Sequence, residues 1–174
     1  MRRAVFFDRD NTLNKDAGYT HTIEEYQLLP SVLSTLKRLE KTNFLKIIIT
    51  NQSGIARGYY AVEHFDGFMT HMLNDFKGNG VTIDGVYHCA HLPDDSCNCR
   101  KPQPGMFFQA ATDHGVDLSI SWSVGNSHSD VVAGKRAGVR TIMLGASNTV
   151  DEEATPHHSV ETLDAAVDII MGTQ

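Results

Sequence analysis

The sequence predicts an α/β fold in which helices cover both faces of a parallel sheet of about five strands. Short runs rich in β-branched and aromatic residues alternate with longer amphipathic stretches, which is the pattern of such a layered fold. No linker, repeat or low-complexity tract divides the 174 residues, and this length is usual for one domain. We therefore treat residues 1–174 as a single domain.

The expected strands are short apolar runs. They are Ala4–Phe7, Leu45–Thr50, Gly85–His88, Ser121–Val124 and Arg140–Leu144. Three of these runs are almost continuously apolar, as expected for strands that are buried on both faces of a sheet.

Amphipathic helices are expected between the strands. The clearest one spans Val62 to Phe76, where apolar residues recur every three or four positions and line one helical face. We interpret the aromatic residues and methionines of this stretch as core packing. Further helices are expected at Ser31–Lys41, Pro104–Gly115, Ser129–Ala137 and Val160–Met171. Gly115 and Gly138 are expected to end the helices that precede them.

Composition and charge exclude several classes of protein. Hydrophobic residues make up 41% of the chain and charged residues 21%, which is ordinary for a globular protein. The formal charge is -6 and the 15 Lys and Arg are scattered, so we expect no nucleic-acid partner. The apolar run after Arg3 is too short for a signal peptide or a membrane span. We therefore expect a cytoplasmic protein without a membrane partner. A monomer is the default expectation for its oligomeric state.

Two carboxylates follow the first expected strand. Asp8 and Asp10 stand two residues apart at its end, and strand geometry points their side chains the same way. Like charges held close together repel unless a cation joins them, and Mg²⁺ prefers oxygen ligands together with a phosphate. One carboxylate can then attack phosphorus while the other handles the leaving-group proton. Taken alone, this pair is a weak signal that also fits a solvated loop or the metal site of a sugar transferase.

Further polar groups follow the later strands. Thr50 ends the second strand and precedes Asn51-Gln52-Ser53-Gly54, whose hydroxyl and turn amides can form an anion cradle. Lys101 comes after the third strand and supplies a cation that neutralises developing phosphate charge. The fourth strand leads into an acidic loop that ends at Asp130. Because ligands bind beyond the carboxyl ends of parallel strands, we expect all of these groups at one edge of the sheet.

Taken in order, these strand-end groups resemble the four motifs of the haloacid dehalogenase superfamily. The resemblance runs nearly end to end, and it points further to the D-glycero-D-manno-heptose 1,7-bisphosphate phosphatases and their relatives, the histidinol-phosphate phosphatases. The segments that carry it are Phe7–Asn14, Gly18-Tyr19 with His21, Thr50–Gly58 and Cys89–Met106. It implies a three-layer, Rossmann-like fold, with no separate cap domain because no large insertion follows the first or second motif. It also implies a Mg²⁺-dependent phosphomonoester hydrolase of carbohydrate metabolism. Its partner would be a small phosphorylated metabolite.

The resemblance also implies roles for individual residues. Asp8 would become transiently phosphorylated, and Asp10 would act first as general acid and then as general base. Thr50 and Lys101 would steady the transferring phosphoryl group. Substrate contacts would come from Asp16, Gly18, Tyr19, Asn51, Gln52, Ser53 and Arg100. The Mg²⁺ ligands would be Asp8, Asp10 through its backbone carbonyl, and Asn126, with Asp130 as a further candidate.

Two related groups of phosphatases fit the sequence to different degrees. The segment TNQSGIARG at residues 50–58 and the run Pro104-Gly105-Met106 resemble the heptose enzymes. The short spacer between His91 and Cys97 also resembles the histidinol branch. We therefore expect D-glycero-D-manno-heptose 1,7-bisphosphate or a similar sugar phosphate as substrate, with histidinol phosphate as the alternative.

A cluster of three cysteines and one histidine follows the third expected strand. Cys89-x-His91 and Cys97-x-Cys99 supply three thiolates and one imidazole, the ligand set of a closed tetrahedral Zn²⁺ site. Disulfides are disfavoured in the cytoplasm, so the alternative is three reduced thiols beside an unrelated histidine. A structural Zn²⁺ is favoured because the ligands are grouped tightly in a Pro- and Asp-containing loop without a hydrophobic core of its own.

The fourth motif departs from the superfamily pattern, which begins Gly-Asp and in the heptose enzymes Gly-Asp-Lys. Here it reads Gly125-Asn126-Ser127, so a neutral amide stands at the third Mg²⁺ ligand and the metal affinity should fall. Divergence and an engineered replacement would both give this sequence. Asp130 either compensates through a water molecule or hydrogen-bonds Lys101. The departure also leaves a non-catalytic phosphate-binding module as an alternative from another functional class.

Overall fold

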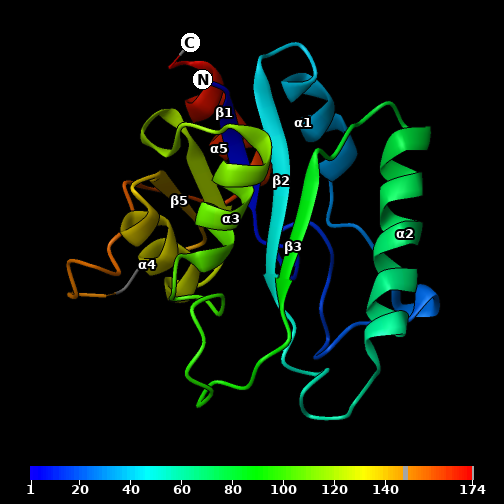
Figure 1. The fold of residues 1–174 in the computed structure, drawn as a ribbon. Coiled ribbons are helices and arrows are strands. Elements are labelled where there is room, and N and C mark those ends of the chain that lie inside the picture. Colours follow the sequence, from blue (N-terminus) through cyan, green and yellow to red (C-terminus); the bar gives the residue numbers. More distant parts are fainter. Residues whose placement is uncertain (147–148, 174) are drawn as a thin grey trace.

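The computed structural model contains one sheet of six strands, all paired in parallel, in the order β3-β2-β1-β4-β5-β6 (Figure 1). It describes residues 1–146 and 149–173. The strands are β1 Arg3–Phe7, β2 Phe44–Asn51, β3 Gly85–Cys89, β4 Trp122–Gly125, β5 Arg140–Leu144 and β6 His158–Val160. The five expected strands are confirmed, each within one residue of its expected bounds.

The sixth strand was not expected. β6 is a three-residue edge strand that pairs with β5, and it is mostly exposed, so no apolar run marks it in the sequence. Val160, expected in the last helix, belongs to this strand instead. The helix starts later because Thr162 caps it, with its side chain accepting a hydrogen bond from the Ala165 backbone N–H.

The helices cover both faces of the sheet. They are α1 Val32–Leu39, α2 Val62–Gly78, α3 Gly105–His114, α4 His128–Ala137 and α5 Leu163–Met171, with short 3₁₀ turns at Ile23–Glu25 and Leu118–Ile120. Gly115 and Gly138 end α3 and α4 with φ values of 65° and 82°, as expected of glycines at helix ends. No helix within the described ranges is long and apolar enough to cross a membrane.

Alternation along β1 divides the core into two layers. Val5 and Phe7 pack with buried side chains of α1, α2 and α5 on one face. Ala4 and Phe6 pack with those of α3 and α4 on the other. The sheet is therefore buried on both sides, which is why its strands are nearly continuous apolar runs.

The order of the strands decides where the polar motifs meet. β1 is central, with β2 and β4 as its neighbours, and Phe7 pairs with Ile48 on one side and Val124 on the other. The backbone N–H of Asp8 donates to the Val124 carbonyl, 2.9 Å away, and continues the pairing beyond β1. The segments that follow β1, β2 and β4 therefore converge at one edge of the sheet.

Candidate active site

An ion-pair triad lies at the carboxyl edge of the sheet. The Nζ atom of Lys101 donates to Asp8 Oδ1 at 2.7 Å, to Asp130 Oδ1 at 2.6 Å and to the Ile49 carbonyl at 3.0 Å. All three side chains are buried. The sequence left two roles open for Asp130, compensation through a water molecule or a hydrogen bond to Lys101. In the structure, its carboxylate accepts a hydrogen bond from Lys101.

Burial dominates the electrostatics of this triad. It raises the pKa of Asp8 to about 7, with Lys101 acting against the shift and the Asp130 and Asp10 carboxylates adding to it. Burial acts against the charged form of Lys101, but the Asp130 and Asp8 carboxylates outweigh it and raise the pKa of the ammonium group. Lys101 therefore stays charged and favours the ionised form of the Asp8 carboxylate.

The Asp10 carboxylate is held at both oxygens. Arg9 donates to Oδ1 from Nε at 2.8 Å, and Gln52 donates from Nε2 to Oδ2 at 2.9 Å. Arg9 is fully buried and also donates to the Thr20 carbonyl at 2.9 Å. Its guanidinium carbon lies 4.8 Å from the ring centroid of Phe68, so a cation–π contact adds to its anchoring.

The second strand anchors the lysine and the floor of the site. Asn51 and the Lys101 backbone exchange two hydrogen bonds of 3.0 Å, which fix the lysine's main chain beside β2. Thr50 is fully buried, and its hydroxyl accepts from Gln52 Nε2 at 2.8 Å. Thr50 thus lies beneath the site and contacts it through Gln52.

These groups surround a cavity of about 320 Å³. Its lining residues are Asp8, Asp10, Asn11, Asp16, Gly18, Tyr19, Asn51, Gln52, Ser53, Tyr60, Lys101, Asn126, Ser127, Ser129 and Asp130. Among them are four carboxylates and one ammonium group, so the lining is strongly anionic. Without an added cation, this excess of negative charge disfavours an anionic ligand.

Most of the expected substrate-contact residues line this cavity, and Arg100 is the exception. Its guanidinium donates to the His91 carbonyl at 3.1 Å, and the side chain lines a neighbouring pocket with Pro93 and Asp95. The loop that carries Asp16 is positioned by Asn11, whose side chain accepts from the Asp16 backbone N–H at 3.0 Å. Asn11 has φ 55°, a left-handed conformation that asparagine tolerates.

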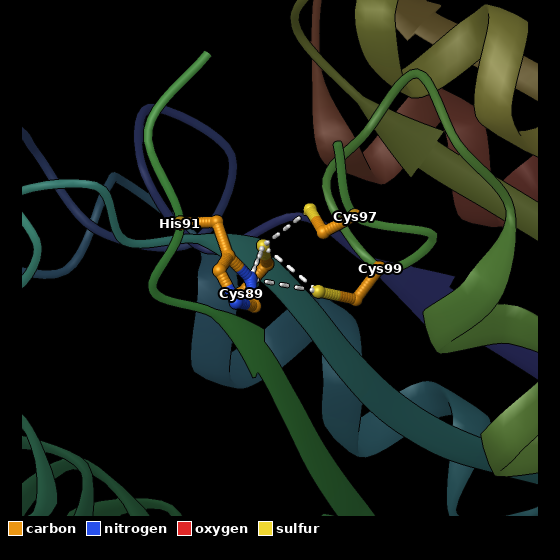
Figure 2. Close-up of side chains that lie close together, drawn as sticks. All are labelled: Cys89, His91, Cys97 and Cys99. Atoms are coloured by element: carbon orange, nitrogen blue, oxygen red, sulfur yellow. Dashed lines mark hydrogen bonds between the residues drawn. The ribbon is translucent and has the colours of Figure 1, made fainter. Parts of the chain in front are cut away.

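The three cysteines and the histidine expected to bind a metal converge in the structure (Figure 2). Cys89 ends β3, and the loop that follows brings His91, Cys97 and Cys99 around it, with one ligand atom of each within 4.8 Å of the others. Cys89 Sγ lies 3.3 Å from His91 Nδ1 and 3.0 Å from Cys99 Sγ, and all three cysteines are free thiols. Lys101 follows Cys99 by two residues, so the same loop carries the lysine of the triad.

Comparison with known proteins identifies the family. Residues 98–166 match the HAD-hydrolase-like family. The D-glycero-beta-D-manno-heptose-1,7-bisphosphate 7-phosphatase of Haemophilus ducreyi is 41% identical over 150 residues, which cover 82% of each chain. The chain belongs to this phosphatase family.

Two further relatives extend the match over almost the whole length. The enzyme of the same name from Pasteurella multocida is 35% identical over 181 residues, covering 99% of this chain and 98% of its own. The crystal structure of the D,D-heptose 1,7-bisphosphate phosphatase from B. bronchiseptica, complexed with magnesium and phosphate, is 29% identical. It superposes with a TM-score of 0.88 and covers 99% of both chains. The chain is thus a phosphatase with the fold of this family.

The fourth motif of this heptose-bisphosphatase family member forms the start of α4. Backbone N–H groups of Asn126 and Ser127 donate to Asp130 Oδ2 at 3.2 and 3.0 Å, and the Ser127 hydroxyl donates to the same oxygen at 2.7 Å. Asp130 therefore uses one oxygen for the helix start and the other for Lys101. Asn126 lines the cavity, and within the described residues no hydrogen bond engages its side-chain amide.

Sequence reasoning missed three residues of this phosphatase site. Arg9 stands between the two aspartates beyond the end of β1, and no local pattern predicts that its guanidinium is buried against Asp10. Tyr60 and Ser129 line the cavity from a loop and a helix start, and no local pattern marks either.

Proposed function

We propose that the chain is a Mg²⁺-dependent phosphomonoesterase that works through a phosphorylated Asp8. The observation that carries this proposal is the buried triad of Asp8, Lys101 and Asp130 on the wall of a cavity that Asp10 also lines. A nucleophilic carboxylate and a second carboxylate for proton transfer are thereby placed on one cavity. Membership of a phosphatase family supports the same chemistry.

The donor set fits Mg²⁺. The lining offers hard oxygen ligands and a negative charge that one ammonium group cannot balance. Asp8, the backbone carbonyl of Asp10, and Asn126 would hold the ion, while Asp130 would remain the partner of Lys101. When bound, the ion would neutralise phosphate charge and bring the phosphate to the nucleophile.

The residues of the chain then divide the reaction between them. An Asp8 oxygen attacks phosphorus in line, and the bond between phosphorus and the leaving-group oxygen breaks with its electron pair going to that oxygen. Asp10 gives this oxygen a proton. In the second half, Asp10 takes a proton from water as the water attacks the aspartyl phosphate, which releases phosphate and restores Asp8. Lys101 and the backbone around Asn51 stabilise the charge on the phosphoryl oxygens.

The substrate would be D-glycero-D-manno-heptose 1,7-bisphosphate or a similar sugar phosphate. The relatives named for this substrate support it, as do the neutral polar groups that line the cavity away from the triad. The side chains of Tyr19, Asn51 and Ser53 can hydrogen-bond hydroxyl groups of a sugar, whereas the buried Gln52 amide is already occupied by protein partners. Asp16 adds a further acceptor for such hydroxyls.

We further propose that the cluster of Cys89, His91, Cys97 and Cys99 binds a structural Zn²⁺. Three thiols and an imidazole that converge within 4.8 Å match a closed tetrahedral site, with no position left for a substrate. The ion would stiffen the loop that leads to Arg100 and Lys101. We assign it no part in the chemistry.

The experiment is phosphate release from heptose 1,7-bisphosphate, histidinol phosphate and p-nitrophenyl phosphate across a Mg²⁺ titration. We expect Mg²⁺-dependent turnover, with kcat/KM at least about tenfold higher for the heptose substrate than for histidinol phosphate, equal to about 1.4 kcal/mol. The reverse preference would assign the chain to histidinol phosphate. Phosphate binding without turnover at saturating Mg²⁺ would indicate a non-catalytic binding module.

A further inference from the structure

A chain of hydrogen bonds leads from Asp10 to a buried tyrosine. The Tyr60 hydroxyl donates to Gln52 Oε1 at 2.6 Å. The Nε2 group of the same amide donates to Asp10 Oδ2 at 2.9 Å and to the Thr50 hydroxyl at 2.8 Å. Gln52 is 2% exposed, so these three partners account for both ends of an amide that is shielded from water.

The tyrosine is itself held firmly. Its side chain is buried, and the His21 ring stacks on it with centroids 4.4 Å apart and planes 10° apart. A Cβ atom at Gly54 would lie 2.2 Å from Tyr60 Cε1, so only glycine at position 54 allows the ring to approach this closely. Burial raises the pKa of Tyr60 to about 12, which keeps the hydroxyl protonated and able to donate.

This chain of hydrogen bonds fixes the position of one atom, Asp10 Oδ2. Asp10 Oδ1 is fixed by Arg9, whose own position does not involve the tyrosine. Among the described residues, only Gln52 donates a hydrogen bond to Oδ2. An amide anchored at its oxygen by Tyr60 presents its N–H₂ group to Oδ2 in one orientation, whereas an amide without that anchor can rotate away.

We propose that Tyr60 is a positioning residue for proton transfer: acting through Gln52, it holds Asp10 Oδ2 in the orientation from which the leaving-group oxygen receives its proton. This inference rests on the proposed function, because it takes Asp10 as the general acid. Tyr60 reaches Asp10 only through the amide and does not touch the transferred proton.

The effect of Tyr60 on the rate should depend on the leaving group of the substrate. A sugar alkoxide is a poor leaving group, so cleavage of its bond to phosphorus needs the proton from Asp10. A nitrophenolate leaves as a stabilised anion and needs that proton little. Loss of the tyrosine hydroxyl should therefore slow the sugar ester much more than the aryl ester.

The test compares kcat/KM of the full chain and its Tyr60→Phe variant on heptose 1,7-bisphosphate and p-nitrophenyl phosphate at saturating Mg²⁺. This quantity covers the steps through departure of the leaving group, so hydrolysis of the aspartyl phosphate does not mask the effect. We expect a loss of about tenfold or more for the sugar ester and of less than about twofold for the aryl ester. Tyr59→Phe, the same change at an exposed neighbouring ring, should leave both values unchanged.

A second measurement keeps the inference falsifiable if Tyr60→Phe also lowers the melting temperature. In a double-mutant cycle with Gln52→Ala, the two losses on the sugar ester should be strongly less than additive, because Tyr60 acts through the amide. Equal losses on both substrates, no loss on either, or additive losses in the cycle would each overturn the inference. If the unmodified chain turned over neither substrate, the proposed function would fail and the inference with it.

Discussion

The ammonium nitrogen of Lys101 lies 2.7 Å from Asp8 Oδ1 and joins the end of β1 to the loop that carries the cysteine cluster. The pair is almost completely buried, with the lysine side chain 2% exposed. Because Asp130 binds the same nitrogen at 2.6 Å, one cation serves two carboxylates. The charge balance of the two carboxylates therefore depends on this shared cation.

Replacing Lys101 with Met should abolish most of the turnover. The variant loses the cation that stabilises phosphoryl charge and orients Asp8, so we expect kcat to fall by about 10²–10³-fold. Initial rates on p-nitrophenyl phosphate measure this directly. Lys46→Met is the matched control, since Lys46 is also buried and ion-paired but lies at the opposite edge of the sheet. It should lower stability and leave kcat unchanged; comparable loss of kcat in both variants would contradict the assignment.

Replacing Asp8 with Asn should stabilise the Mg²⁺-free protein at alkaline pH. A carboxyl whose folded pKa is raised to about 7 favours folding least when it is ionised, so its contribution declines as pH rises from about 4 through 7. Lys101 keeps Asp130 as its partner in the variant. We expect Asp8→Asn to be more stable than the unmodified chain at pH 8 by on the order of 1 kcal/mol, with a much smaller difference near pH 4. Urea unfolding in EDTA at both pH values measures it, and a destabilised variant at pH 8 would count against the electrostatic account.

Restoring a carboxylate at position 126 should tighten Mg²⁺ binding. Asn126 lines the cavity and is proposed as a neutral oxygen ligand, so an added negative charge there should lower the Mg²⁺ concentration for half-maximal activity about tenfold. Asn43→Asp adds the same charge on an exposed loop at the far edge of the sheet and serves as the control. An unchanged Mg²⁺ dependence in Asn126→Asp would show that residue 126 is not a ligand.

Removing one thiol of the metal cluster should cost both zinc and stability. We expect about one Zn²⁺ per chain in the unmodified protein, strongly reduced content in Cys97→Ser, and a melting temperature lower by at least about 5 °C. Ser96→Ala, next to it in the loop, should retain the metal. Elemental analysis and thermal denaturation give the two readouts. If the unmodified protein contains no zinc and has the same melting temperature as the variant, the cluster is three reduced thiols that bind no metal.

The fold could be predicted from the sequence because each central strand is buried on both faces and therefore has a continuous apolar run. β6 could not, because an exposed edge strand of three residues carries no such run. The helix that was expected from Val160 shows the same limit: apolar spacing marked α5, but the cap at Thr162 decided where it begins.

The residues of the site also fall into those that the sequence predicts and those that it does not. Residues that follow strands, such as Asp8, Asp10 and Lys101, were predictable because the topology brings strand ends to one edge. The partners that orient them were not, since Arg9 and Tyr60 reach Asp10 through buried contacts that leave no periodic signal. Arg100 shows the converse: its neighbour Lys101 faces the cavity, whereas its own guanidinium binds the His91 carbonyl.

The central claim is that Asp8 carries the phosphoryl group, and acid quenching of a reaction with ³²P-labelled substrate tests it most directly. Acid preserves an aspartyl phosphate long enough for the label on the protein to be counted. The account predicts label on the unmodified chain that maps to the peptide containing Asp8 and is absent from Asp8→Asn. Equal label on both proteins, or rapid turnover by Asp8→Asn, would contradict it.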